Sequence, residues 1–255
     1  AADGVFALLP ALAALAGALL LQIGVNLAND YFDCVKGIDG AERLGPVRVA
    51  ASGLMPLPRL RLGIALDFGL ALLVGLYLVR AGGWPILAIG LAAMLAALGY
   101  SGGPAPIASL GLGDVFVFAF FGLAGVCGTY YVQALALTPA VVIAALPVGA
   151  LITAILVVNN LRDIASDTRA GKRTLAVVLG PAGARAEYAL LVLASYAAPV
   201  ALLARGDAGA RVLLPLASLP LAAFLIRAVY REEGRALNRV LAGSAMLALL
   251  FSALL

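Results

Sequence analysis

The sequence predicts an all-α fold, a polytopic bundle of transmembrane helices, and three observations support this prediction. Of the 255 residues, 64% are hydrophobic and 12% are charged, whereas a soluble domain is usually about half apolar and about a quarter charged. The mean hydropathy is +1.09. The apolar residues lie in long runs, and the alternation of lipid and lumen faces that marks a transmembrane barrel is absent.

Eight of these runs approach or reach the length of about 20 residues that a helix needs to cross the hydrocarbon core. Prolines lie inside several of them, which membrane helices tolerate because neighbouring groups satisfy the freed carbonyls. The spans are expected at 5–29, 60–80, 84–101, 114–134, 139–161, 182–204, 209–230 and 237–255. In order, the connections that bound them are 31–59, 81–83, 102–113, 135–138, 162–181, 205–208 and 231–236.

The connections alternate between the two sides of the membrane, and the distribution of Lys and Arg tests this alternation. Fourteen of the 17 cationic residues lie on or near the side that receives 31–59 and 162–181, and the other side holds only Arg80, Arg205 and Arg211. Cytoplasmic loops of membrane proteins carry the excess of positive charge. The basic side is therefore predicted to face the cytoplasm, and the protein is expected in the plasma membrane.

Composition excludes several kinds of site. The sequence contains no His, which removes His general bases, His-ligated zinc and haem ligation by His. Cys34 and Cys127 form neither a disulfide framework nor a metal-ligand spacing. The formal net charge of +4 is concentrated on one side, which fits an anionic substrate or anionic lipid headgroups and not a nucleic-acid partner.

Two short polar segments, 26–39 and 159–174, interrupt this apolar sequence. Each places an Asn about one helical turn before an Asp, and a second Asp follows three or four residues later. This spacing puts the groups on one helix face, and carboxylates at a membrane helix end are costly enough to suggest a function. Two such clusters facing each other would hold Mg²⁺, which prefers hard oxygen ligands and shares them with phosphate. The candidate metal ligands are Asp30, Asp33, Asp163, Asp167, Asn26 and Asn160.

A purely structural alternative is that each Asp only caps a helix or pairs with an Arg. The cations near both segments favour the functional interpretation, because Arg and Lys bind phosphate oxygens, although each could instead contact lipid phosphate. Asp114 opens a predicted helix, where it would also interact favourably with the helix dipole. The candidate substrate-binding residues beside the two Asn are Lys36, Arg43, Arg48, Tyr100, Asp114, Arg162, Lys172 and Arg173.

Several ordered motifs carry a resemblance to a known family. The first polar segment, followed by Arg43–Arg48 and Ser52-Gly53, resembles the UbiA-type intramembrane aromatic prenyltransferases. Within that family, the motifs are similar to the branch that prenylates 1,4-dihydroxy-2-naphthoate in menaquinone synthesis. The stretches that match this branch are 26–39, 111–114, 128–133 and 159–175.

The resemblance implies a reaction and roles for the residues. Asp30, Asp33, Asp163 and Asp167 would bind Mg²⁺ and the diphosphate of a polyprenyl diphosphate. Dihydroxynaphthoate would be prenylated with loss of carbon dioxide, giving a demethylmenaquinone, and the prenyl tail would lie in an apolar groove open to membrane lipid. Many members carry a third Asp where this chain has Gly37, and Asp39 is expected to replace it as a catalytic ligand or base.

The family also fixes expectations about architecture. Its members have nine transmembrane helices, so the eight of this chain imply that the first family helix precedes Ala1. One transmembrane prenyltransferase domain is expected over residues 1–255, with two weakly repeated halves at about 1–134 and 135–255.

Three alternatives to the naphthoate reaction remain open from the sequence. A closely related enzyme would differ only in its acceptor, which would be hydroxybenzoate, homogentisate or a porphyrin. An ion-coupled secondary transporter would also use repeats and intramembrane carboxylates. A structural membrane scaffold would need no chemistry from the Asp residues.

Overall fold

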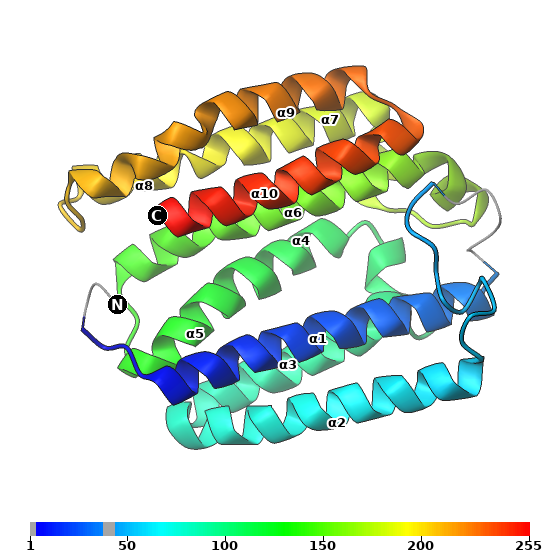
Figure 1. Cartoon of the computed structure of the whole chain (residues 1–255), viewed down its shortest axis with the longest axis horizontal. Helices are drawn as coiled ribbons and strands as arrows, with labels where there is room; N and C mark the ends of the chain where they lie inside the picture. The colour runs from blue at the N-terminus through cyan, green and yellow to red at the C-terminus, as the bar shows by residue number, and fades with distance from the viewer. Residues whose placement is uncertain (1–3, 38–43) are drawn as a thin grey trace. The chain divides into compact units, whose positions relative to one another are not determined.

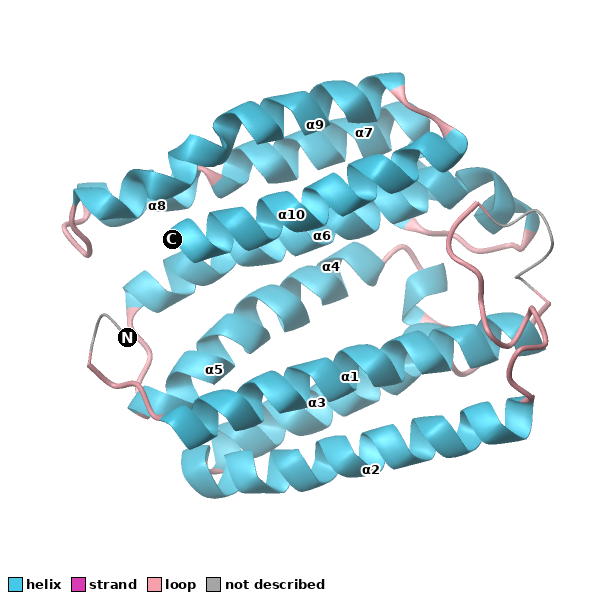
Figure 2. Cartoon of the chain, viewed as in Figure 1, coloured by secondary structure: helices cyan, strands magenta, loops and turns pink. Residues whose placement is uncertain are grey.

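The computed structural model describes residues 4–37 and 44–255, and within these ranges all regular elements are helices (Figures 1 and 2). The helices are α1 (Leu8–Val35), α2 (Leu57–Gly82), α3 (Trp84–Ser101), α4 (Gly113–Val117), α5 (Gly125–Ala134), α6 (Pro139–Arg169), α7 (Leu175–Ser195), α8 (Ala197–Ala204), α9 (Leu219–Arg231) and α10 (Leu237–Leu254). A π-helical stretch, Phe118–Ala124, joins α4 to α5. Short 3-10 segments lie at Ile107–Ser109, Ala210–Ser218 and Gly234–Ala236.

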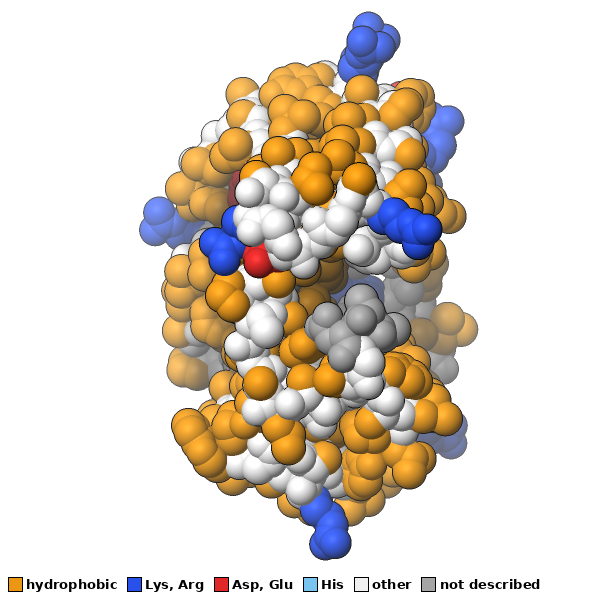
Figure 3. Space-filling view, turned by 90° about the vertical axis from the view of Figure 1, so that its left-hand side faces the viewer, with side chains coloured by type: hydrophobic (Ala, Val, Ile, Leu, Met, Phe, Trp, Pro, Cys, Tyr) orange, Lys and Arg blue, Asp and Glu red, His pale blue; other side chains and the backbone are white. Residues whose placement is uncertain are grey.

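Eight helical spans in the described residues are long and apolar enough to cross a membrane, which confirms the predicted fold class. Four of them are single helices, α1, α2, α3 and α6. The other four combine consecutive helical pieces, as in Gly113–Ala134 and Leu175–Ala204. The chain is therefore a multi-pass membrane protein. One face, seen from the left of Figure 1, is covered mostly by hydrophobic side chains with scattered cationic ones (Figure 3).

Two predicted helix ends were too early. Helix α1 continues to Val35 instead of ending at 29, and α6 continues to Arg169 instead of 161. Each extension carries the polar cluster as part of the helix. In α1, Asp30 accepts hydrogen bonds from the backbone of another segment, and in α6, Asp163 accepts them from Arg162 of the same helix. Helix α7 begins at Leu175 and not at 182, and a non-helical Gly180 with φ of 70° precedes Pro181.

The helices form two compact units by their contacts. The first unit comprises Ala1–Leu110 and Gly128–Leu137, and α1, α2 and α3 pack against one another within it (Figure 1). Gly24 allows the close approach of α2, since a Cβ there would lie 3.0 Å from the ring of Phe68. The backbone N–H of Ala7 donates to Oε1 of Gln133 at 3.2 Å, which ties the start of α1 to the end of α5.

The second unit comprises Gly111–Cys127 and Thr138–Leu255. Helix α6 packs against α7, α10 and the π-helical stretch. Its core is apolar, with fully buried Val157, Leu247 and Phe251, and Tyr188 shares a buried hydrogen bond with Ser244 at 2.8 Å. Gly122 of the π-helical stretch serves close packing, because a Cβ there would collide with the backbone of α6. The prediction of one domain with two repeated halves stays a prediction.

Candidate active site

The first acidic patch consists of Asn29, Asp30 and Asp33 on the last two turns of α1. Both carboxylates are buried, with 5% of Asp30 and 6% of Asp33 exposed. The two oxygens of Asp30 accept hydrogen bonds from the backbone N–H of Val49 at 3.0 Å and of Ala50 at 3.3 Å. Arg48 Nη2 lies 3.9 Å from Oδ2 of Asp33. A segment 19 positions away in the sequence therefore covers the acidic face of this helix.

The covering segment, defined as Arg48–Met55, is shaped by its own turns. Backbone hydrogen bonds join Ser52 N to Arg48 O and Met55 N to Val49 O, at 3.0 Å each. Gly53 has φ of +73°, a left-handed conformation that glycine adopts without strain. These turns direct two successive N–H groups at the Asp30 carboxylate, which is a favourable arrangement for a negative charge.

A polar chain connects the first patch to the end of α3. Ser101 Oγ donates to Oδ1 of Asn29 at 2.5 Å, and the backbone carbonyl of Ser101 accepts from Nζ of Lys36 at 2.8 Å. Lys36 Nζ also lies 5.8 Å from the ring centroid of Phe32, a cation–π arrangement. The Lys36 ammonium is thus held beside the patch by contacts with neutral groups.

The other candidates of the first unit lie around this patch. Asn26 is exposed and its Nδ2 donates to the backbone of Gln22 at 3.0 Å, while Tyr100 is half-buried in the last turn of α3. Asp39 and Arg43 lie outside the described residues.

The second acidic patch consists of Asn159, Asn160, Arg162, Asp163 and Asp167 at the end of α6. Its centre is the buried guanidinium of Arg162, whose side chain is 1% exposed. Nε and Nη2 of Arg162 donate to the two oxygens of Asp163 at 2.8 and 2.6 Å. This is a bidentate pair, the strongest geometry between these groups.

Two amides complete the environment of Arg162. Nη2 donates to Oδ1 of Asn159 at 2.7 Å, and Nη1 donates to Oδ1 of Asn238 on α10 at 2.6 Å. Arg162 therefore positions Asp163 through contacts that its own helix and α10 supply. Asn160 is buried on the same helix, with 9% of the residue exposed.

The end of the second patch forms a tight turn. Asp167 is buried, and its backbone carbonyl accepts from the N–H of Lys172 at 2.9 Å across the left-handed Gly171. Lys172 is half-buried and Arg173 is exposed. Thr174 then caps α7 by accepting from the N–H of Val177 at 3.3 Å.

Asp114 lies in the second unit at the start of α4. It is 5% exposed, and its Oδ2 is buried without a hydrogen-bond partner among the described residues. Glu187 on α7 also has a buried oxygen without such a partner, and the two carboxylates interact electrostatically. Sequence analysis identified Asp114 and missed Glu187, which stands inside an apolar helix without a neighbouring motif.

The carboxylate oxygens of both patches are the type of ligand that Mg²⁺ prefers. Each patch offers two carboxylates, and one or two are enough for Mg²⁺ when substrate phosphate and water complete its coordination. Within the described ranges, no group of three or more acidic or thiol side chains gathers to form a closed metal cage. A carboxylate oxygen that accepts one hydrogen bond keeps a further lone pair, so Asp30 and Asp163 retain the capacity to coordinate a cation.

Comparison with known proteins places these motifs. The profile of the UbiA prenyltransferase family matches residues 1–252. The chain belongs to the UbiA prenyltransferase family. The resemblance drawn from the sequence motifs is thereby confirmed, and the two acidic patches are features of a UbiA family member.

Three curated relatives of this UbiA protein carry the same name, 1,4-dihydroxy-2-naphthoate octaprenyltransferase. The protein of Escherichia coli K12 is 42% identical over 76% of this chain and 65% of its own length. The protein of Mycobacterium tuberculosis H37Rv is 41% identical over 81% of this chain and 78% of its own length. The protein of Bacillus subtilis 168 is 32% identical over 82% of this chain and 67% of its own length. The matched region thus spans less than two thirds of the Escherichia coli relative.

Sequence analysis found the carboxylates of both patches and missed most of their supports. Asn29 and Asn159 stand directly beside residues that were singled out, so adjacency was the available signal. Ser101 and Asn238 are 72 and 76 positions from their partners, and nothing in local spacing points to them.

Proposed function

We propose that this protein transfers a polyprenyl group from a polyprenyl diphosphate to 1,4-dihydroxy-2-naphthoate in menaquinone synthesis. The observation that carries the proposal is the pair of buried Asp patches at the ends of α1 and α6 in a UbiA family member. The names of the relatives support the donor and the acceptor. The cationic residues near both patches support a negatively charged leaving group.

In this proposal, the residues of both patches serve the diphosphate of the donor. Asp30, Asp33, Asp163 and Asp167 hold Mg²⁺, which supplies charge neutralisation to the diphosphate. The residues Lys36, Arg48, Lys172 and Arg173 contact its oxygens. Arg162 keeps Asp163 oriented, since its guanidinium is committed to protein partners.

The bond changes balance without an external oxidant. The allylic C–O bond of the donor breaks and its electron pair leaves with the diphosphate, and a ring carbon of the acceptor forms the new C–C bond. The electrons of the ring–carboxylate bond restore the aromatic ring as carbon dioxide departs, which gives the quinol form of demethylmenaquinone. The apolar helices exclude water from the cationic intermediate.

We further propose that the protein lies in the plasma membrane with both patches at the cytoplasmic face. The excess of Lys and Arg in the connections on that side supports this orientation.

The direct test is product formation in membranes that contain the protein. Dihydroxynaphthoate, octaprenyl diphosphate and Mg²⁺ are added, and the prenylated quinol is measured by mass spectrometry. Asp30→Asn and Asp163→Asn should each lower the rate by about 100-fold or more, the size of loss seen when a transition-state charge partner is removed. Chelation by EDTA should abolish product, and Mg²⁺ should restore it.

Asp207→Asn is the matched control. Asp207 pairs with Arg205 at 2.7 Å on an exposed turn, so its rate should match the unaltered protein. Hydroxybenzoate and homogentisate are offered in parallel, and prenylation of either in place of dihydroxynaphthoate would replace the proposed acceptor. Full activity of both Asp→Asn variants would overturn the proposed role of the patches.

A further inference from the structure

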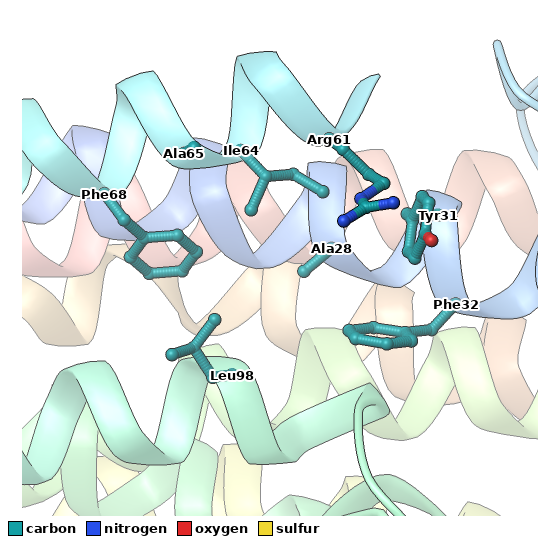
Figure 4. A pocket seen from close by; sticks show the side chains of 8 residues that line it. All are labelled: Ala28, Tyr31, Phe32, Arg61, Ile64, Ala65, Phe68 and Leu98. Atoms are coloured by element: carbon teal, nitrogen blue, oxygen red, sulfur yellow. The ribbon is translucent and has the colours of Figure 1, made fainter. Parts of the chain in front are cut away.

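An apolar pocket of about 310 Å³ lies between the helices of the first unit, apart from the acidic face of α1 (Figure 4). Ala28 and Phe32 line it from α1, Ile64 and Phe68 from α2, and Leu98 from α3. Its size is at the lower end of the range for small-molecule sites.

One cationic residue lies at the rim of this pocket. Arg61 lines it from α2, and Figure 4 shows its guanidinium beside Tyr31, at the opposite end from Phe68. Phe68 follows Arg61 by seven positions along α2, which is about 10 Å of helix. The pocket is therefore amphipathic along its length, cationic at one end and hydrocarbon-like at the other.

Arg61 is available for a ligand. It is exposed, and it makes no ion pair or hydrogen bond with any residue of 4–37 or 44–255. The first turn of α2 contains Arg59 and no acidic residue, and the amino end of a helix carries partial positive charge. The charges in the first turn of α2 thus favour an anion.

We propose that this pocket binds an anionic phospholipid of the surrounding bilayer, with one acyl chain between Ile64 and Phe68 and the phosphate at Arg61. A basic group at the edge of a pocket between membrane helices is the expected arrangement for an anionic headgroup. The long Arg side chain places its charge at the interface while its stem covers apolar surface.

The pocket lies on the other side of the helix that carries the first acidic patch. Ala28 and Phe32 are four residues apart and share one face of α1, whereas Asp30 and Asp33 point to the covering segment Arg48–Met55. A lipid chain in the pocket would pack against the face of α1 opposite Asp30 and Asp33, so its binding would stabilise the first unit.

The test measures lipid retained by the purified full chain. Detergent-solubilised protein is incubated with phosphatidylglycerol or with phosphatidylcholine of the same acyl chains, and bound lipid is measured by native mass spectrometry. Phosphatidylglycerol should be retained in preference to phosphatidylcholine. Arg61→Gln should lower phosphatidylglycerol affinity about five-fold, the effect of one cationic side chain near an anionic membrane surface, and should leave phosphatidylcholine unchanged.

Two further variants test the lipid headgroup and the acyl chain separately. Arg59→Gln is the matched control, because Arg59 is a neighbouring exposed cation that does not line the pocket, and its lipid affinity should be unchanged. Ala65→Phe fills the pocket and should remove binding of both lipids. Arg61→Gln alters an exposed residue and keeps the test valid should the filled variant not fold.

Three results would overturn the proposal. Equal affinity of Arg61→Gln and the unaltered chain for phosphatidylglycerol would mean that Arg61 does not bind the headgroup. Equal retention of phosphatidylglycerol and phosphatidylcholine would mean that the pocket does not select an anionic headgroup. Displacement of phosphatidylglycerol by geranylgeranyl thiodiphosphate would assign the pocket to the prenyl donor, and not to a bilayer lipid.

Discussion

The two acidic patches contain similar residues, but different kinds of donor hold them. In the first patch, Asp30 accepts from backbone N–H groups of a covering segment, and Arg48 stays 3.9 Å from Asp33. In the second patch, Asp163 is gripped by the buried guanidinium of Arg162 at 2.6 and 2.8 Å. The first patch depends on a segment that folds over the helix, whereas the second depends on packing between helices.

This difference indicates a division of labour between the two patches. A carboxylate held by a loop can exchange its partners when an anion and its cations arrive, because the loop can move without unfolding a helix. A carboxylate held by a buried Arg is fixed in advance, because any movement would leave a buried charge without its partner. We expect the first patch to respond to the substrate and the second patch to be preorganised.

The largest expected effect comes from breaking the buried Arg162 pair. Arg162→Gln should lower the free energy of unfolding by about 3 kcal/mol, because it leaves the charge of Asp163 without its partner in a largely buried place. Arg48→Gln in the first patch should cost less than about 1 kcal/mol, since its contact with Asp33 is long and the Arg48 side chain is 21% exposed. Titration with denaturing detergent, followed by circular dichroism, measures both.

Equal losses in these two variants would remove the distinction between the patches. A charge-conserving control, Arg162→Lys, should recover only part of the loss. Lys has one ammonium group and cannot reproduce the fork that reaches Asp163, Asn159 and Asn238 together.

An intermediate effect is expected in the covering segment of the first patch. Asp30→Asn replaces one carboxylate oxygen by an amide nitrogen, so only one of the two N–H groups of Val49 and Ala50 keeps an acceptor. Loss of one hydrogen bond to a charged group should speed amide exchange at these two residues by about ten-fold. Hydrogen–deuterium exchange with mass spectrometry measures this rate in peptides that cover Arg48–Met55.

Asp163→Asn supplies the contrast for the exchange experiment. It should leave exchange in the covering segment unchanged, because Asp163 accepts from Arg162 and not from a loop. Unchanged exchange in Asp30→Asn would mean that the covering segment is held by its own turns alone.

The fold was largely predictable because hydropathy reports burial in lipid directly. Eight apolar runs became eight helical spans, and the third expected span, 84–101, matches α3 at both ends. The errors fell at the ends of α1 and α6 and at the start of α7, where the apolar run stops but the helix continues. Hydropathy marks where an apolar run stops, and it does not report the polar turns that continue the helix beyond that point.

The sequence predicted the carboxylates of the site and did not predict the residues that hold them in place. Helical spacing found Asp30, Asp33, Asp163 and Asp167, since the period of a helix places them on one face. Their supports include the backbone N–H of Val49, which donates to Asp30, the side chain of Asn238, which accepts from Arg162, and the hydroxyl of Ser101, which donates to Asn29. Backbone donors leave no trace in residue identity, and a single Asn or Ser in an apolar helix has no spacing to interpret.

The smallest expected effect concerns the support of the first patch from α3. Ser101→Ala removes the hydroxyl that donates to Asn29 at 2.5 Å and leaves the Ser101 carbonyl free to accept from Lys36 as before. The loss of one neutral hydrogen bond should lower the free energy of unfolding by about 1 kcal/mol. The same detergent titration measures it.

A double-mutant cycle with Asn29→Ala tests whether this loss belongs to the pair. The double variant should be about 1 kcal/mol more stable than the sum of the single losses predicts, because the hydrogen bond can be lost only once. A coupling of zero would mean that Ser101 does not hold Asn29. Asn29 would then be free to contact substrate. The covering segment alone would order the first patch, and the contrast with the second patch, which is held by packing between helices, would be larger.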